Sequence, residues 1–300
     1  MSQTIVVATR KSALALAQAR AWMNELRGEH AGLVVEELHV TTTGDRVQDR
    51  ALNEIGGKGL FIKEIEEALV DGRAHIAVHS MKDVPAELAP ALAIGCVPKR
   101  EDPRDVVITR DGRPFAELSA GSKVGTSSLR RRVQLEAWRG DLEFLPLRGN
   151  VDTRLRKLSE GVVDAIILAR AGLVRLGLAD KATETLPAER CLPAIGQGAL
   201  GIEQRQGDDA VRALLAPLMD AETNVAVAAE RGVMRAVEGS CQVPVAAYAL
   251  RQGERLWLRA MLAEPDGSNM RRRETETSWP TSAEEAARIG EELGSELKRS

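Results

Sequence analysis

One cysteine stands where a reactive group would be expected. Cys241 lies in "EGSCQVPV", after a long helical pattern and just before a strand pattern, with Gly239 and Ser240 before it and Pro244 after it. Cysteine is usually a small buried residue, whereas Gly, Ser and Pro are typical of turns, which lie on protein surfaces. The pattern therefore predicts an accessible thiol, and its role has to come from the rest of the chain.

A second candidate is the basic stretch from 123 to 157. It holds nine Lys or Arg residues against four Asp or Glu residues, in a chain whose formal net charge is -3. Some of these residues have the pattern of solvated helix faces. We interpret Arg132, Arg139, Arg156 and Lys157 as residues of this kind.

Four other arginines stand at junctions between strands and helices. Arg130 and Arg131 open a helix directly after "VGTSS". Arg148 ends a strand, and Arg154 lies in the first turn of the next helix, with Asn150 as its predicted N-cap. Helix N-termini offer free N–H groups and a positive dipole end, and arginine binds carboxylate or phosphate through paired hydrogen bonds. These positions predict a binding site for a polyanionic ligand.

Asp83 is the candidate acid. It follows a predicted strand, 74–80, in "HSMKDVP". One interpretation is a structural ion pair with Lys82. The other is a carboxylate that hydrogen-bonds an N–H group and stabilises a developing cation. The spacing alone leaves both open.

Alternating strands and helices are expected to position these candidate residues. Apolar strands are predicted at 4–9, 33–40 and 74–80, with helices at 12–27 and 60–70. The pattern then repeats, because 122–138 resembles 5–22 and 155–173 parallels 66–84. Two such units predict two α/β lobes around a cleft, with Arg10 and Ser12 placed in the first lobe as Arg130 is in the second.

Two further regions complete the organisation. The glycine-rich stretch 43–59 lacks periodicity and predicts a mobile lid that carries Lys58. A helix at 219–237, three strands joined by "RQGER" and "EPDGS", and a helix at 282–298 predict a small α+β domain. The expected domains are 1–98 plus 199–217, 99–198, and 218–300, and "PAIGQG" around Gln197 is interpreted as a hinge.

Composition excludes several classes of protein. Aromatic residues are 3% of the chain and the net charge is slightly negative, so neither nucleic acid nor membrane is an expected partner. The three cysteines and four histidines show no zinc spacing. Unpaired cysteines and an N-terminus that reads as a strand rather than a signal peptide indicate a cytoplasmic protein, and no apolar run is long enough to span a membrane.

The sequence resembles the porphobilinogen deaminase (hydroxymethylbilane synthase) family almost from end to end. One departure from the family pattern is Glu54, where some members have lysine. The motifs that carry the resemblance are "ATRKSALALAQ", "TTGD", "GGKGLF", "AVHSMKDVP", "KREDPRD", "GTSSLRR", "LRGNVDTRL", "ARAGLVRL", "PAIGQGALGIE" and "EGSCQVPVAA".

The resemblance implies both a fold and a reaction. The fold has two periplasmic-binding-protein-like lobes around a cleft and a small C-terminal α+β domain with a three-stranded antiparallel sheet. The reaction condenses four porphobilinogen molecules head to tail, with release of ammonia, into the linear tetrapyrrole hydroxymethylbilane. It is implied to take place on a dipyrromethane cofactor bound through a thioether to Cys241, in a cytoplasmic monomer that needs no metal.

The resemblance also implies residue roles. Asp83 is implied to be the catalytic carboxylate, and Cys241 the cofactor anchor. The implied cofactor contacts are Lys82, Thr126, Ser128, Arg130, Arg131 and Arg154. The implied contacts to incoming substrate or growing chain are Arg10, Ser12, Gln18, Lys58, Arg148 and Arg175.

Two rival interpretations remain at this point. A two-lobed anion-binding or sensor protein without chemistry would share the fold, but it gives no role to an exposed cysteine. A cysteine enzyme of the acyl-transfer type would need a base near the thiol, and the histidine nearest to Cys241 in sequence is the distant His79. The intact mass of the purified chain distinguishes all three.

Overall fold

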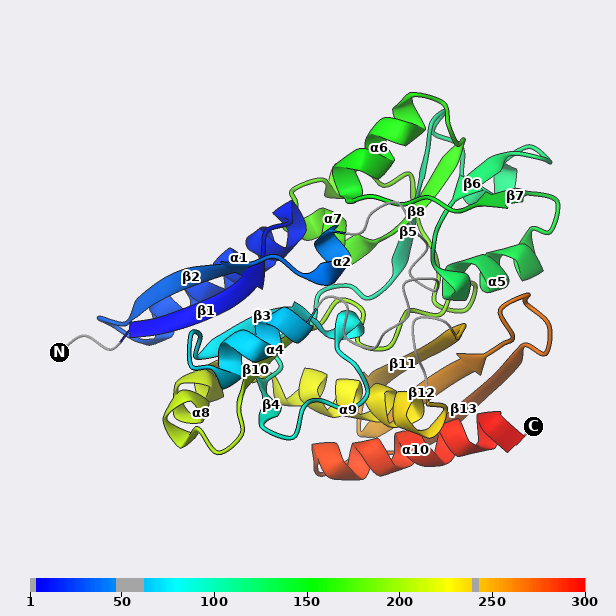
Figure 1. The fold of residues 1–300 in the computed structure, drawn as a ribbon. Coiled ribbons are helices and arrows are strands. Elements are labelled where there is room, and N and C mark those ends of the chain that lie inside the picture. Colours follow the sequence, from blue (N-terminus) through cyan, green and yellow to red (C-terminus); the bar gives the residue numbers. More distant parts are fainter. Residues whose placement is uncertain (1–3, 47–61, 239–242, 300) are drawn as a thin grey trace. The chain divides into compact units, whose positions relative to one another are not determined.

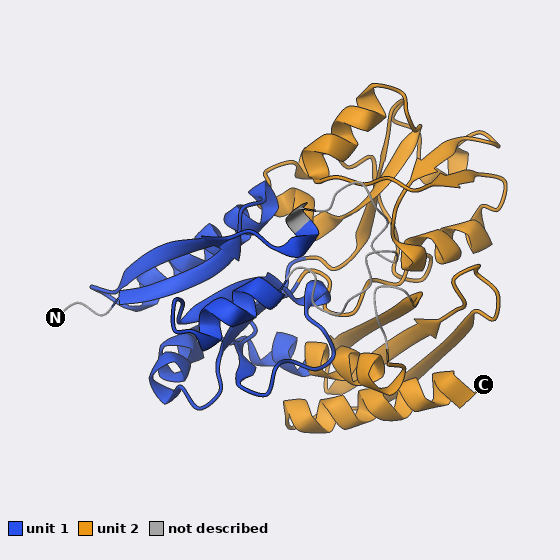
Figure 2. Ribbon diagram, viewed as in Figure 1, with its two compact units in different colours: residues 1–101, 199–225 blue, residues 102–198, 226–300 orange. Residues whose placement is uncertain are grey.

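The computed structural model describes residues 4–46, 62–238 and 243–299. Most of the predicted lid, with Glu54 and Lys58, and the thiol-bearing Cys241 lie outside these described residues. The chain divides into two compact units, one of residues 1–101 and 199–225 and one of residues 102–198 and 226–300 (Figure 2).

The first unit is built on a mixed five-stranded sheet with the order β2-β1-β3-β10-β4. The strands are β1 (Thr4–Arg10), β2 (Val34–Val40), β3 (Ile76–Ser80), β4 (Leu92–Cys96) and β10 (Leu200–Arg205). β1 runs parallel to β2 and β3, whereas β10 runs antiparallel to β3 and β4. The late strand β10 thus joins the N-terminal strands in one sheet.

Helices cover both faces of this sheet, because its strands are apolar on both sides. Trp22 and Leu26 of α1 (Ala13–Glu29) pack with Val211 of α8 (Asp209–Leu215) on one face. Ile65 and Leu69 of α4 (Lys63–Val70) pack on the other face (Figure 1). Short turns of helix complete the unit: α2 (Thr43–Arg46), η1 (Met81–Asp83) and η4 (Ala216–Leu218).

The second unit repeats this topology in a sheet with the order β7-β6-β8-β5-β9. Its strands are β5 (Asp105–Thr109), β6 (Lys123–Gly125), β7 (Glu143–Leu145), β8 (Ala165–Ala169) and β9 (Glu184–Thr185). β6 is parallel to β7 and β8, and β5 is antiparallel to β8 and β9. The helical segments are η2 (Phe115–Glu117), α5 (Leu129–Trp138), α6 (Val151–Ser159), α7 (Arg170–Arg175) and η3 (Ala179–Lys181).

The C-terminal region contributes an antiparallel sheet, β11 (Val245–Gln252), β12 (Arg255–Leu262) and β13 (Arg271–Ser278), with α9 (Ala221–Ala236) and α10 (Ala283–Arg299). α10 packs on β12 and β13 (Figure 1). α9 and α10 approach so closely that glycine is required. A Cβ at Gly290 would lie 1.9 Å from the carbonyl oxygen of Ala229, and one at Gly232 would lie 2.1 Å from that of Ala287.

The predicted fold class is confirmed: two α/β sheets of repeated topology and a three-stranded antiparallel sheet with helices. Two local predictions are wrong. β7 ends at Leu145, so Arg148 follows the strand by three residues instead of ending it. The stretch from 43 is not wholly loop, because Thr43–Arg46 forms a turn of helix whose first N–H donates to Glu64 at 2.8 Å.

Candidate functional site

The N-terminus of α5 is organised by the sequence "GTSS". Ser128 is the N-cap, and its hydroxyl accepts from the backbone N–H of Arg131 at 3.4 Å. The buried Thr126 accepts a hydrogen bond from the Ser128 N–H at 3.2 Å. The β6 exit and the α5 entry are thereby locked together, and two consecutive arginines occupy the first turn of the helix.

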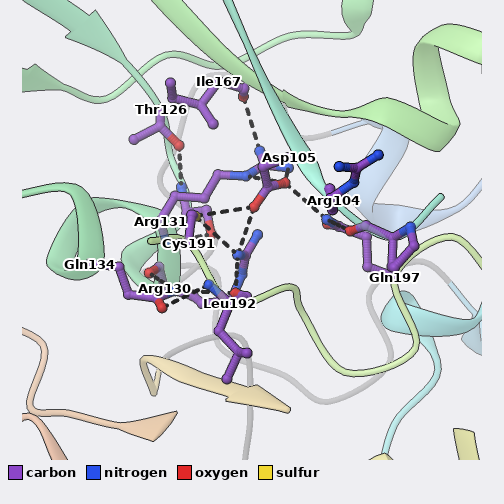
Figure 3. Close-up of polar contacts among 12 residues, drawn as sticks. Arg104, Asp105, Thr126, Arg130, Arg131, Gln134, Ile167, Cys191, Leu192 and Gln197 are labelled. Atoms are coloured by element: carbon purple, nitrogen blue, oxygen red, sulfur yellow. Dashed lines mark hydrogen bonds and ion pairs between the residues drawn. The ribbon is translucent and has the colours of Figure 1, made fainter. Parts of the chain in front are cut away.

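Both of these arginines are buried and bind one aspartate that the sequence did not single out. Asp105 is fully buried at the start of β5 (Figure 3). Its Oδ2 accepts from Arg130 Nη1 at 2.7 Å, and its Oδ1 accepts from Arg131 Nη2 at 2.8 Å and Nε at 3.1 Å. Gln197 Nε2 donates to the same Oδ1 at 2.9 Å. The arginine pair is therefore held by one carboxylate.

The charge state of Asp105 follows from this environment. Burial alone would raise the pKa of the carboxyl, because a charge is costly away from water. The charges and hydrogen bonds of Arg130 and Arg131 outweigh burial and bring the pKa of Asp105 well below its usual range. Asp105 is therefore ionised at neutral pH.

Two cysteines lie in the described part of the chain, and both are buried. Burial raises the pKa of each thiol, Cys96 and Cys191, to about 12. For Cys191 the neighbouring Asp105 acts in the same direction, and the thiol donates to Asp105 Oδ2 at 3.3 Å. Because the thiolate is the reactive form, these two side chains are poor nucleophiles.

A second group of arginines lies at the start of α6. Asn150 caps this helix as predicted, by accepting from the Thr153 N–H at 2.9 Å. Gly149 has a φ of +111°, and a Cβ there would lie 2.6 Å from Cγ2 of Thr153, so only glycine fits between Arg148 and the cap.

Arg148 and Arg154 form no ion pair with an acidic side chain in the part of the chain that the structure describes. Burial, followed by the charges of Arg131 and Arg148, lowers the pKa of Arg154 to about 10. Arg154 Nε donates to the carbonyl oxygen of Gly149. Arg148 Nη1 is buried and has no hydrogen-bond partner among the described residues. Arg148 and Arg154 thus add positive charge beside Arg131, whose own charge is paired with Asp105, and an anion would stabilise this cationic cluster.

One prediction about the remaining basic residues is wrong. Arg139 is not a solvated helix residue, because its guanidinium donates to the carbonyl oxygens of Phe115, Ala116 and Leu118 at 2.7 to 3.1 Å. The sequence pattern could not predict these contacts of Arg139, since they depend on where the η2 turn lies in the fold.

In the first unit, Asp83 ends the η1 turn directly after β3 and is exposed. Within the described ranges its carboxylate has neither an ion pair nor a hydrogen bond, so no pairing with Lys82 is found there. Lys82 is also exposed. The strand before them is fixed by Gln18, whose buried amide exchanges hydrogen bonds with the Ser80 hydroxyl at 3.0 and 3.1 Å.

The other predicted site residues have identifiable places. Ser12 is the N-cap of α1 and accepts from the Ala15 N–H at 3.3 Å. Arg10 is the last residue of β1. Arg175 ends α7 and donates to the carbonyl oxygen of Gly198 at 2.6 Å.

Sequence reasoning missed Asp105 and treated Gln197 only as part of a hinge. One signal was available for Asp105: it begins a strand, "DVVIT", whose other residues are apolar or buried. A carboxylate at a buried position almost always has a cationic partner.

Neither a metal-ligand cluster nor a membrane-spanning helix is found in the described ranges. Over residues 4–46, 62–238 and 243–299, no three His, Cys, Asp or Glu side chains are grouped as metal ligands. In the same ranges, no helix combines the length and apolar character needed to cross a bilayer.

Comparison with known families identifies two matching models. "Porphobilinogen deaminase, dipyromethane cofactor binding domain" matches residues 5–213, and "Porphobilinogen deaminase, C-terminal domain" matches residues 224–299. Together they cover almost the whole chain.

Curated relatives carry the same name. A porphobilinogen deaminase from Sorangium cellulosum is 62% identical over 299 residues, with complete coverage of both chains. One from Syntrophotalea carbinolica is 52% identical and covers 90% of this chain and 85% of its own. One from Syntrophobacter fumaroxidans is 50% identical and covers 98% and 94%.

Similar solved structures are more distant. The periplasmic aliphatic sulphonate binding protein SsuA from Escherichia coli is 12% identical, with a TM-score of 0.43 and coverage of 79% of this chain and 71% of its own. The BvgS VFT2 domain from Bordetella pertussis is 15% identical, with a TM-score of 0.42 and coverage of 71% and 84%. Both scores are below 0.5, so the fold assignment rests on the strand order of this chain.

Proposed function

Because the chain belongs to the porphobilinogen deaminase family, we propose that it is a transferase that makes hydroxymethylbilane. It condenses four porphobilinogen molecules head to tail and releases ammonia at each addition. The observation that supports this function most directly is the cationic cluster of Arg131, Arg148 and Arg154, in which Asp105 pairs with Arg131 alone. Each pyrrole unit carries an acetate and a propionate, so a growing chain is a string of carboxylates that such a cluster would bind.

The same cluster fits a dipyrromethane cofactor, whose two rings carry four carboxylates. A nearby anion would give the buried Arg148 Nη1, which has no partner in the described residues, a hydrogen-bond acceptor. The same anion would oppose the positive charges that lower the pKa of Arg154. We propose that Lys82, Thr126, Ser128, Arg130, Arg131 and Arg154 hold the cofactor and that Cys241 anchors it through a thioether. When bound, this group supplies the pyrrole carbon to which the first substrate is joined.

Asp83 is the proposed catalytic carboxylate. When the aminomethyl C–N bond of porphobilinogen breaks, its electron pair leaves with ammonia, and the substrate ring becomes cationic. A carboxylate that accepts a hydrogen bond from the pyrrole N–H stabilises this cation. After the new C–C bond forms, the ring proton must be removed, and the same carboxylate can accept it. The exposure of Asp83 and its lack of a partner in the described structure support this role over a structural ion pair.

Arg10, Ser12, Gln18, Lys58, Arg148 and Arg175 are proposed contacts to incoming substrate or growing chain. Domains of 1–98 plus 199–217, 99–198 and 218–300 are proposed as functional divisions. We also propose a cytoplasmic monomer that acts on a small molecule and binds neither nucleic acid nor membrane.

The intact mass of the purified chain tests this function. We expect one dipyrromethane unit above the sequence mass, with the adduct on the peptide that contains Cys241 after digestion. Addition of porphobilinogen should then give species heavier by successive pyrrole units. Active enzyme with an unmodified Cys241 would contradict the proposal.

A further inference from the structure

Asp105 binds two arginines of the proposed site, and each arginine donates to a different oxygen of its carboxylate. Oδ2 accepts from Arg130, whereas Oδ1 accepts from two nitrogens of Arg131. We propose that Asp105 is a positioning residue for this arginine pair, which fixes the orientation of both guanidiniums toward a carboxylate ligand. The proposal rests on the proposed function, because it assumes that the ligand is the pyrrole chain.

The pair would not keep its geometry without this carboxylate. Arg130 and Arg131 are neighbours in sequence, and each is only 6% exposed. Two like charges away from water repel each other and are costly to bury. Their other described acceptors are neutral: Leu192 O at 2.6 Å and the Cys191 sulfur at 3.7 Å for Arg130, and Ile167 O at 3.0 Å for Arg131. Asp105 is thus the one charged group that these hydrogen bonds reach in the described residues.

Asp105 is itself held rigidly. Its backbone lies in the β5–β8 ladder, in register with Ala169. Its carboxylate is further held by Gln197 Nε2 and the Cys191 thiol (Figure 3). A side chain that is held on several sides moves little, so it can keep its neighbours in a fixed orientation.

A second contact fixes the helix that carries the pair. The buried Gln134 donates to the carbonyl oxygens of Arg130 at 3.0 Å and Leu192 at 3.2 Å, and accepts from the Leu192 N–H at 2.9 Å. The first turn of α5 is thereby joined to the segment at Cys191. Both the backbone and the side chain of Arg130 are therefore positioned.

Each guanidinium still has donors for a ligand. Arg130 uses only Nη1 in the hydrogen bonds found within the described chain, so its Nε and Nη2 remain available. Arg131 Nη1 and Nη2 each carry a second N–H beyond the one already engaged. Asp105 therefore orients the pair without saturating it.

The test compares Asp105→Asn with wild type and with a matched control, Asp164→Asn. Asp164 also pairs with an arginine of the second unit, Arg110, at 2.9 Å, but does not contact the arginine pair. For each protein we would measure the melting temperature and, by intact mass, the fraction of folded chain that carries the dipyrromethane cofactor, which is the primer for elongation. We would also count the pyrrole units attached after a few equivalents of porphobilinogen.

We expect Asp105→Asn to lower primer occupancy about 10-fold or more, or to stop elongation early, since hydrogen bonds to charged groups are among the strongest in proteins. Asp164→Asn should give wild-type masses. If Asp105→Asn melts earlier but its folded fraction shows wild-type occupancy and elongation, Asp105 has only a structural role and the inference is wrong.

The experiment also distinguishes a failure of the proposed function from a failure of the variant to fold. If wild type carries no adduct, the proposed function fails, whatever the variants do. If Asp105→Asn does not fold, Asp105→Glu decides, because it keeps the charge but moves the carboxylate by one methylene. The inference then requires reduced occupancy or early stalling in Asp105→Glu, and wild-type masses in that variant would overturn it.

Discussion

The two α/β sheets share a topology, yet each presents an aspartate in an opposite environment. Asp83 in the first unit follows β3 in an exposed turn, and its carboxylate has no partner in the described structure. Asp105 in the second unit begins β5, is fully buried, and is bound by two arginines, an amide and a thiol. The same residue type is thus free to act in one sheet and is fixed in the other.

This difference separates chemistry from positioning. A catalytic carboxylate must reach the reacting atoms and gain interactions only as charge develops. A positioning carboxylate must have its interactions already formed, so that the groups it holds do not reorganise during the reaction. Substitutions should therefore affect turnover at Asp83 and stability together with primer binding at Asp105.

The largest expected effect is on stability. Asp105→Ala leaves two buried guanidiniums without a countercharge, and removing one partner of a buried ion pair costs about 3–5 kcal/mol. Asp83→Ala should change the free energy of unfolding by no more than about 0.5 kcal/mol, as is usual at exposed positions. Urea unfolding of both variants checks this, and similar losses at the two positions would remove the distinction.

The thiols sharpen the comparison, because Cys191 shares the environment of Asp105. With pKa values raised from 9.0 to about 12, Cys191 and Cys96 should hold about 1,000-fold less thiolate near neutral pH than an ordinary thiol. We expect iodoacetamide to label neither in the folded protein and both after unfolding. Fast native labelling of either one, located by peptide mass, would contradict the burial that we describe.

Arg148 tests the unbalanced charge near α6. Arg148→Met removes a buried nitrogen that has no partner in the described residues and relieves the repulsion on Arg154. We expect an unchanged or slightly higher melting temperature, but a KM for porphobilinogen raised by about 10-fold, since one charge-assisted contact is lost. A large fall in melting temperature with an unchanged KM would show that Arg148 is structural.

The smallest effect is expected at acid pH. Because the folded-state pKa of Asp105 is depressed, its contribution to stability is present above its unfolded value of about 3.9 and is lost as the pH falls toward the folded value. Wild type should therefore lose stability below about pH 4 more steeply than Asp105→Asn. Parallel curves for the two proteins would indicate that Asp105 does not titrate as we describe.

Local signals predicted much of this molecule. The apolar periods, the Asn150 cap and the position of Asp83 after a strand are written within a few residues of each site, and the structure reproduces these elements. The role of Asp105 is not local, because its partners lie 25, 26 and 92 residues away and meet it only when β5, α5 and the segment at Gln197 pack. Arg139 was misjudged for the same reason, since its carbonyl partners lie more than 20 residues away.

The most direct test of the account is Asp83→Asn, measured for turnover and melting temperature on one preparation. The amide keeps the shape of the side chain but removes the charge that would stabilise the substrate cation. We predict an unchanged melting temperature, a full primer adduct on Cys241, and turnover per folded molecule at least ~100-fold lower, the scale expected for loss of one electrostatic stabiliser. A lowered melting temperature with near-normal turnover would contradict the account and assign Asp83 a structural role.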